Sequence, residues 1–369
     1  MKNTNIGICF GGYCPLHHGH LDVIMQAKKE NDVCYVIVCG YNDEPRSWEI
    51  NLTLDQRFEI IKDFFKDDEQ IRVRKINDTE LGIDESMSDH NWTVWQKAVK
   101  HIFGNDWIYP SDEHLYNVTW YVAEPFYKQA IERTNILDAK VVLIDKLNPV
   151  SGTAIRKNPI PYWNKITAPF KKYLTKNILV IGTASEGKST LVRDISRYFD
   201  IPYAEEFGRV YMGVNNLRDQ DLTVTDFEAF LIGQNELSLA KIKSSKNGLF
   251  ISDTDALVTL MYAKAYVEDE DIMISQTDYG KRLVPLAEKI LSNIKWDHIF
   301  IFPPNKEFID DGCRYMVQSS MNERQKNFSK LMLLVNKYYD NVPKSFMVGS
   351  FLENFNEVKN YINGIIEGK

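Results

Sequence analysis

Short apolar runs alternate along the chain with longer segments in which apolar residues recur every three or four positions. The short runs predict β-strands over residues 5–10, 33–39, 71–75, 120–122 and 141–144. The periodic segments between them predict helices over residues 20–29, 54–65, 92–103 and 126–133. Continuous apolar strands that alternate with amphipathic helices are typical of a parallel sheet with helices on both faces. We therefore expect an α/β fold with a doubly wound parallel sheet in the first part of the chain.

A stretch without sustained periodicity separates this first series from a second one. Residues 157–177 contain Pro159, Pro161 and Pro169 among aromatic and charged residues, which predicts a packed connection between two domains. The pattern then restarts, with strands predicted over residues 178–181, 248–252, 298–302 and 346–348. Helices are predicted over residues 189–199, 225–243, 256–266, 279–292, 324–339 and 352–366. A chain of 369 residues suits two domains, which we place at residues 1–165 and 166–369, each built on a doubly wound parallel sheet.

Composition and charge narrow the class of protein. The chain is 44% hydrophobic and 26% charged, as globular proteins are, and no apolar run is long enough to predict a transmembrane helix. Residues 1–5 lack the basic and apolar regions of a signal peptide, so we expect a cytoplasmic protein. The formal net charge of −7 argues against general nucleic-acid binding. The spacing of Cys9, Cys14, Cys34 and Cys39 differs from that of zinc sites, which favours structural cysteines.

A glycine- and histidine-containing segment follows the first predicted strand. Gly11 and Gly12 allow the backbone to approach a phosphate chain closely, and the N-terminus of the next helix favours anions. His17 and His20 offer two donors to a triphosphate, where they would neutralise charge that develops on the α-phosphate and the leaving pyrophosphate. The alternative is a solvated loop. Three of the seven histidines of the chain lie within four residues here, which favours nucleotidyl transfer.

A second phosphate motif follows the first predicted strand of the second series. Gly182 and Gly187, with four residues between them, precede Lys188 and Ser189 in the order of a Walker A motif. In such a loop backbone amides surround the phosphates, Lys188 reaches the β- and γ-phosphates, and Ser189 holds Mg²⁺. We count Thr190 among the ATP-binding residues. The motif indicates phosphoryl transfer from ATP.

Other residues of the second series suit such a kinase. Residues 249–255 form an apolar strand that ends in carboxylates, so Asp253 is a candidate Mg²⁺ ligand. Asp255 is a candidate for contact with Mg²⁺ or the substrate, or for capping the helix that follows. Glu206 is favoured over Glu205 as the group that orients and deprotonates the substrate hydroxyl.

Two late arginines are candidates for the transition state of phosphoryl transfer. Arg314 and Arg324 follow the strand predicted over residues 298–302, and we expect them to form a mobile lid over the phosphates. The alternative is that both are ordinary surface arginines.

The first phosphate motif resembles the hallmark of the nucleotidyltransferase superfamily, G-x-[FY]-x-P-x-H-x-G-H. Its positions are filled by Gly11, Tyr13, Pro15, His17, Gly19 and His20. The partner motif of that superfamily, I-S-x-T-x-x-R, resembles residues 150–156. The resemblance implies that Ser151 and Thr153 cap a helix and donate to phosphates, and that Arg156 binds the triphosphate.

The whole chain is similar to the bifunctional nicotinamide-nucleotide adenylyltransferase/ribosylnicotinamide kinase (NadR) family. Further stretches carry this similarity, namely residues 91–100, 123–125, 161–163, 206–209, 253–255 and 310–314. The resemblance implies a Rossmann-like nucleotidyltransferase followed by a P-loop kinase. The kinase would phosphorylate nicotinamide riboside with MgATP, and the nucleotidyltransferase would join AMP from a second ATP to nicotinamide mononucleotide, giving NAD and pyrophosphate. Trp92 or Trp95 would stack on the nicotinamide ring, unless both only pack in the core.

Three departures from the family bear on function. Members often carry an N-terminal DNA-binding domain, which this chain lacks, so we expect no role in binding DNA. Gly12 stands where enterobacterial relatives carry lysine, and residues 42–54 form a shorter stretch than in those relatives. The main alternative is therefore a riboside kinase with a degenerate, binding or regulatory first domain. A different small-metabolite nucleotidyltransferase and a non-enzymatic nucleotide sensor are further alternatives, and relatives suggest a homo-oligomer.

Overall fold

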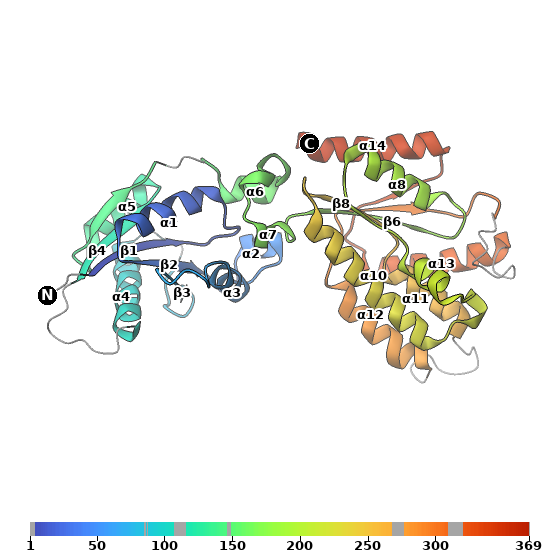
Figure 1. Cartoon of the computed structure of the whole chain (residues 1–369), viewed down its shortest axis with the longest axis horizontal. Coiled ribbons are helices and arrows are strands. Elements are labelled where there is room, and N and C mark those ends of the chain that lie inside the picture. The colour runs from blue at the N-terminus through green and yellow to red at the C-terminus, as the bar shows by residue number, and fades with distance from the viewer. Residues whose placement is uncertain are drawn as a thin grey trace. The chain divides into compact units, whose positions relative to one another are not determined.

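The chain folds into two compact units, which comprise residues 1–174 and 175–369 (Figure 1). The computed structural model describes residues 4–84, 86, 88–106, 116–145, 149–267, 277–308 and 320–368. The units divide nine residues after the expected position 165 because the connector packs into the first unit. Its Trp163, Ile166, Phe170 and Leu174 are all buried in one hydrophobic cluster of that unit. None of the helices that the structure describes is long and apolar enough to cross a membrane.

The described residues of the first unit form a five-stranded parallel sheet with the strand order β3-β2-β1-β4-β5. Its strands are β1 (Thr4–Gly11), β2 (Val33–Gly40), β3 (Ile71–Asn77), β4 (Tyr116–Val122) and β5 (Lys140–Leu143). The order reverses direction at β1, which pairs with both β2 and β4. In open sheets of this kind ligands bind beyond the carboxyl ends of the strands at such a reversal. The predicted doubly wound fold is confirmed.

Helices cover both faces of this sheet. They are α1 (His18–Glu30), α2 (Pro45–Ile50), α3 (Leu54–Phe64), α4 (Asp89–Asp106), α5 (Pro125–Thr134), α6 (Gly152–Lys157), the 3₁₀-helix η1 (Ile160–Lys165) and α7 (Ala168–Lys171). Alternate residues of β2 serve the two faces, because successive strand side chains point in opposite directions. Val36 and Val38 pack with α1 and α3, whereas Tyr35 and Ile37 pack with α4 and α5. Two cores explain why the strand is apolar throughout.

The second unit also contains a five-stranded parallel sheet in its described residues, with the order β10-β9-β6-β8-β7. Its strands are β6 (Lys176–Gly182), β7 (Tyr203–Ala204), β8 (Leu249–Asp253), β9 (His298–Phe302) and β10 (Lys344–Phe346). The central strand β6 is buried along almost its whole length and pairs with β8 and β9. This position puts the carboxyl end of β6, and the loop after it, at the reversal of strand order.

Helices also lie on both faces of the second sheet. Figure 1 shows α8 and α14 on one face and α10, α11, α12 and α13 on the other. The helices are α8 (Lys188–Phe199), α9 (Phe207–Asn215), the 3₁₀-turn η2 (Asp219–Asp221), α10 (Val224–Ser244), α11 (Ala256–Val267), the π-helical turn η4 (Tyr279–Leu283), α12 (Val284–Leu291), α13 (Met321–Tyr338) and α14 (Phe351–Glu367).

The sequence pattern missed several short elements. A helix as short as α2 shows less than two turns of periodicity, and β7 has only two residues. Helix α9 contains Gly208 and Gly213, which weaken a helical prediction. The helix predicted over residues 279–292 is a π-helical turn followed by α12, which has a proline in its first turn.

Candidate functional site

The first phosphate motif lies at the carboxyl end of β1, beside a cavity of about 260 Å³. Gly11, Gly12, Tyr13 and His20 line this cavity. The ring of His20 stacks on that of His17, with 3.7 Å between centroids and 24° between planes. The edge of Tyr13 meets the ring of His20, with 4.9 Å between centroids. His20 thus faces the cavity, whereas His17 is 1% exposed and supports the ring of His20.

The predicted partner motif is part of the same cavity. Gly152, Thr153 and Arg156 of α6 line it together with the glycines after β1. Arg156 donates through Nη1 to the carbonyl oxygen of Cys14 at 2.7 Å and through Nη2 to the hydroxyl of Thr153 at 3.2 Å. Segments that are more than 130 residues apart in the sequence are therefore joined by a charged side chain at one cavity.

A second cavity, of about 280 Å³, adjoins the first. Phe10, Asp78, Trp92, Trp95 and Tyr127 contribute to its wall. The two indole rings lie 6.0 Å apart at 72°, and Trp95 also packs on Phe10 with 4.9 Å between centroids. Both tryptophans therefore belong to the hydrophobic core and line a cavity as well. Their aromatic surfaces suit a flat heterocycle.

Asp78 gives this second cavity an unusual acid. Burial raises the pKa of its carboxyl to about 6, against the opposing effect of the Arg46 guanidinium. Glu44 also raises this pKa, and a hydrogen bond to Trp95 lowers it. The residue follows β3 at the same sheet edge as Gly11. The carboxyl thus changes charge within the physiological range of pH.

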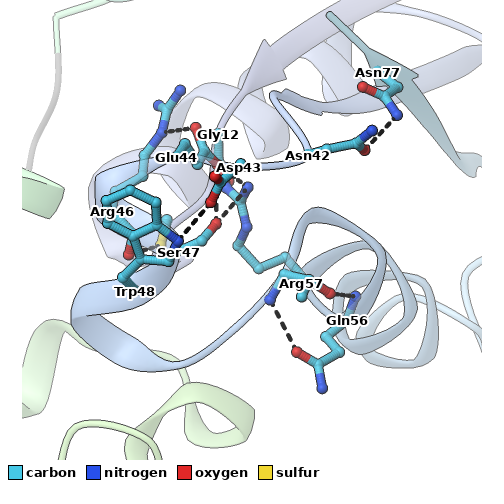
Figure 2. Close-up of polar contacts among 12 residues, drawn as sticks. Gly12, Asn42, Asp43, Glu44, Arg46, Ser47, Trp48, Gln56, Arg57 and Asn77 are labelled. Carbon is cyan, nitrogen blue, oxygen red and sulfur yellow. Dashed lines mark hydrogen bonds and ion pairs between the residues drawn. The ribbon is translucent and has the colours of Figure 1, made fainter. Parts of the chain in front are cut away.

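A buried ion network supports the glycine loop from below (Figure 2). Arg57 of α3 is fully buried and donates to the carbonyl oxygen of Gly12 and to Oε1 of Glu44. Glu44 is 2% exposed and also accepts a hydrogen bond from the Ser47 hydroxyl at 3.2 Å. The other carboxylate oxygen of Glu44 pairs with Nε of Arg46. One carboxylate therefore holds two guanidinium groups beside Gly12.

The second phosphate motif forms the loop between β6 and α8 in the second unit. Gly182 has φ of +145°, and a Cβ there would collide with the carbonyl oxygen of Phe302. Gly187 has φ of +86°, in the region that favours glycine. Lys188 begins α8, and its Nζ donates to the carbonyl oxygen of Thr183 at 2.7 Å. Thr190 is exposed on the first turn of the same helix. The two glycines thus have positive φ in the loop between β6 and α8, as the sequence motif favours.

Polar groups gather beyond this loop at the carboxyl end of β8. Asp253 is 3% exposed and is hydrogen-bonded to the side chain of Ser189. Burial raises the pKa of Asp253, while Lys188 opposes this and Glu206 adds to it. Ser189 and Asp253 offer neighbouring oxygen ligands of the kind that Mg²⁺ takes beside phosphates. Among the described residues no group of three or more His, Cys, Asp or Glu could hold a metal ion.

A mainly apolar cavity continues from Glu206 between α9, α10 and α11. Its polar wall includes Glu206, Asp219 and Tyr266, and its apolar wall includes Phe227 and Phe230. The hydroxyl of Tyr266 donates to Asp219 at 2.7 Å. Glu206 lies 3.5 Å from a guanidinium nitrogen of Arg209. A wall that combines carboxylates with aromatic rings suits a nucleoside with free hydroxyls.

Known proteins show the same two-part organisation. The family described as Cytidylyltransferase-like matches residues 8–158, and the family described as AAA domain matches residues 177–341. The chain is 26% identical to the "Trifunctional NAD biosynthesis/regulator protein NadR" of Salmonella typhimurium over 353 residues, which are 91% of this chain and 78% of that protein. It is 25% identical to the protein of the same name from Escherichia coli, over 90% of this chain and 77% of that protein.

Two solved structures have a similar fold over nearly the full length of this chain. A crystal structure of NadR protein in complex with NR has a TM-score of 0.80 and 27% identity, and it covers 99% of this chain and 96% of its own. The chain is thus similar to NadR proteins over nearly its whole length. A crystal structure of NadR protein in complex with NAD and AMP-PNP has a TM-score of 0.79, also with 27% identity. It covers 100% of this chain and 97% of its own.

Two predicted site residues, Ser151 and Asp255, have other surroundings than the sequence suggested. Ser151 precedes α6, but its hydroxyl makes no capping hydrogen bond, so the predicted cap is wrong. Asp255 accepts a hydrogen bond from the hydroxyl of Tyr339 at 2.5 Å and one from the backbone of Leu257 at 3.0 Å. Asp255 thus stabilises the start of α11 and does not line the cavity of Glu206. Of the two roles considered for Asp255, the structure favours helix capping.

The prediction that Arg324 forms part of a mobile lid is wrong. This residue of α13 is 2% exposed, and its guanidinium donates to the carbonyl oxygens of Ala184 at 2.8 Å and Lys306 at 2.6 Å. It also pairs with the fully buried carboxylate of Glu186. Arg324 therefore fixes the phosphate loop from behind, because its charge is already paired inside the protein. Arg314 lies outside the described residues.

Sequence reasoning missed several residues that line or support the cavities of both units. Arg46, Glu44 and Asp78 in the first unit and Asp219 and Tyr266 in the second belong to no motif that the sequence displays. The only local signal is position, since Glu44 follows β2 and Asp78 follows β3 at the carboxyl edge of the sheet. Polar residues after successive parallel strands are candidates for a ligand site on that ground alone.

The buried ion network leads to a prediction about stability. We expect Arg57→Ala to lower the free energy of unfolding of the first unit by about 3–5 kcal/mol, because it leaves the Glu44 carboxylate buried without its main partner. Six of the seven tryptophans precede residue 175, so denaturation followed by tryptophan fluorescence reports mainly on this unit. Arg133→Ala, which removes an exposed ion pair with Asp89, should cost less than about 1 kcal/mol. Equal effects of the two changes would contradict the assignment.

Proposed function

We propose that the protein makes NAD in two steps, each in its own unit. The second unit phosphorylates the 5′-hydroxyl of nicotinamide riboside with MgATP, and the first unit joins AMP from another ATP to the resulting mononucleotide. The observation that carries this proposal is that each unit places one glycine-containing motif, with cationic or imidazole side chains beside it, at the reversal point of its own sheet. The ligands named for the solved NadR structures, NR in one and NAD with AMP-PNP in the other, agree with both steps.

In the first unit the reaction needs positioning and charge neutralisation and no covalent intermediate. A phosphate oxygen of the mononucleotide attacks the α-phosphorus of ATP, and the bond to pyrophosphate breaks. His20, Thr153 and Arg156 line the cavity in which the triphosphate would lie, so they would donate to its oxygens. His17 would keep the ring of His20 in place through their stacking contact.

In the second unit the 5′-hydroxyl of the riboside attacks the γ-phosphorus of ATP. Glu206 lines the substrate cavity next to the phosphate loop, so it would accept the proton of that hydroxyl. Lys188 would bind the β- and γ-phosphates, and Ser189 and Asp253 would hold Mg²⁺, which neutralises charge on the transferred group. The carboxylate of Asp219 would bind ribose hydroxyls deeper in the cavity.

The second cavity of the first unit would take the nicotinamide ring. Trp92 and Trp95 provide aromatic walls, and the carboxylate of Asp78 favours the positive charge that the ring carries in the mononucleotide. An acidic group here also disfavours a ring with a carboxylate, so we propose that nicotinamide is preferred over nicotinate.

The raised pKa of Asp78 leads to a pH prediction. Since Asp78 gains its negative charge as pH rises through about 6, we expect KM for nicotinamide mononucleotide to fall about fivefold between pH 5 and pH 7, the equivalent of about 1 kcal/mol. The cavity is also lined by Arg46 and Asp84, and the pKa of Asp78 is affected by Arg46 and Glu44. The substrate phosphate titrates nearby, so the profile is compared with that of Asp78→Asn. A fall of equal size in Asp78→Asn would contradict the role of this carboxyl.

The overall proposal is tested by incubating the purified protein with nicotinamide riboside and MgATP and separating the products over time. Mononucleotide followed by NAD is the expected result. Mononucleotide without NAD would mean that the first unit is a binding or regulatory domain, and neither product from folded protein would overturn the proposal. A cytoplasmic location, a homo-oligomer and the absence of nucleic-acid binding stay predictions.

A further inference from the structure

We propose that Arg46 is the cation that holds the mononucleotide phosphate against the α-phosphate of ATP, and that position 12 is glycine to make room for it. This inference rests on the proposed adenylyl transfer in the first unit and assigns a further residue to it. It follows from three observations, which concern the space beside Gly12, the availability of the guanidinium and the place where the two cavities meet.

The guanidinium of Arg46 lies where a side chain at position 12 would begin. A Cβ built on Gly12 would be 2.6 Å from Nη1 and 3.1 Å from Cζ of Arg46. The backbone itself does not demand glycine here, because Gly12 is not among the residues with positive φ. The guanidinium therefore occupies the space beside Gly12, and a larger residue at position 12 would shift the end of the Arg46 side chain.

The guanidinium is held but not neutralised. Glu44 is the one carboxylate between two arginines, and the fully buried Arg57 already balances its charge. Arg46 uses Nε for Glu44, and within the described residues no hydrogen bond occupies its Nη1 or Nη2. The Arg46 side chain is 38% exposed, in contrast to the buried Arg57. Glu44 alone therefore does not balance both arginines. Arg46 presents two outward-facing nitrogen atoms (Figure 2), and Asp78 is a second carboxylate that interacts with its charge.

The charge lies where the two cavities of the first unit meet. Arg46 and Gly12 line the cavity of His20 and Arg156, and they also line the cavity of Trp92 and Asp78. In the proposed reaction the triphosphate enters from one side and the mononucleotide from the other, so two anions must approach each other at this junction. A guanidinium can donate to two phosphate oxygens at once. It would lower their repulsion and align the attacking oxygen.

The first test compares Arg46→Ala with Arg46→Lys in adenylylation of nicotinamide mononucleotide. We expect Arg46→Ala to lower kcat by about 10- to 100-fold, with a smaller rise in KM for each substrate, and Arg46→Lys to restore part of the loss. Riboside phosphorylation in the second unit, measured on the same samples, should stay within twofold of the wild type. Arg133→Ala serves as an arginine control outside both cavities. Unchanged adenylylation in Arg46→Ala would overturn the proposal.

The second test uses the contact between positions 12 and 46. Gly12→Ala should lower adenylylation by pushing the guanidinium away, but it should add little to the loss in Arg46→Ala, where that group is missing. The two changes are therefore expected to be strongly non-additive. If Gly12→Ala lowered adenylylation by the same factor in the wild type and in Arg46→Ala, glycine would be needed at position 12 for another reason. That result would overturn the proposed link between positions 12 and 46.

A binding measurement separates this proposal from the proposed function. NAD is the product that would span both cavities, so its affinity can be measured by calorimetry without turnover, in the Lys188→Ala background to limit binding in the second unit. We expect Arg46→Ala to weaken NAD binding by about tenfold. If the wild type forms no NAD but binds it through Arg46, the proposed reaction is wrong and the site assignment holds. If NAD binds equally with and without the Arg46 side chain, the assignment is wrong whatever the activity.

Discussion

Lys188→Ala should lower phosphorylation of nicotinamide riboside by about 10³-fold, which is the largest effect we expect from one substitution in this protein. The lysine begins α8 directly after the phosphate loop, and its Nζ is held over that loop by the carbonyl oxygen of Thr183. Without it the negative charge on the β- and γ-phosphates loses its nearest fixed cation, both in the bound ATP and in the transition state. Formation of ADP or of mononucleotide, measured under saturating riboside, reports the loss.

Adenylylation of nicotinamide mononucleotide should not change in Lys188→Ala, because the triphosphate site for that reaction is built from other residues in the first unit. Lys337→Ala removes an exposed lysine of α13 that pairs with Glu288, and it is a matched control for loss of charge. Loss of both reactions in folded Lys188→Ala protein would contradict the assignment of one reaction to each unit.

His20→Ala should have the opposite selectivity and lower adenylylation by about 10²- to 10³-fold while riboside phosphorylation persists. The imidazole lines the cavity of Gly11, Thr153 and Arg156, and it is fixed there between the ring of His17 and the edge of Tyr13. A donor held in this way needs little rearrangement when charge develops on the α-phosphate, which is why its removal should affect kcat more than KM.

The neighbouring His18 supplies a control for this second prediction. It lies in the same first turn of α1 but is not among the residues that line either cavity. His18→Ala should therefore retain adenylylation within about threefold of the wild type. If His18→Ala and His20→Ala were equally impaired, the loss would reflect damage to the start of α1 and not the removal of a phosphate-binding group.

Much of the fold could be predicted because its causes are local. The continuous apolar runs of β1, β2, β6, β8 and β9 appear in the sequence as strands, since both faces of each strand are covered by helices. The long helices were predicted within a few residues of their ends. The glycines and cations of the two phosphate motifs were also recognisable, because the backbone turn and the groups that contact phosphate are adjacent in the chain.

The surroundings of single charged residues were not predictable in this way. Arg57 lies within the amphipathic helix α3, where a charged residue is expected to face solvent, yet it is fully buried. Arg324 suggested a mobile lid and is instead paired with Glu186 inside the second unit. In each case the partner carboxylate comes from a segment 13 or more residues away, so no local pattern indicates that the charge is neutralised.

The sequence by itself determined the two α/β units, their order and the kind of chemistry at each, because hydrophobic periodicity and phosphate-binding turns are properties of short segments. Only the tertiary structure decided which ionisable groups serve that chemistry. It buries Arg57 and Arg324 as supports, assigns Asp255 to the start of a helix and leaves the guanidinium of Arg46 partly exposed beside Gly12. The physical reason is that the charge state and accessibility of a side chain depend on neighbours from other elements, and the packing of the sheet edge selects those neighbours.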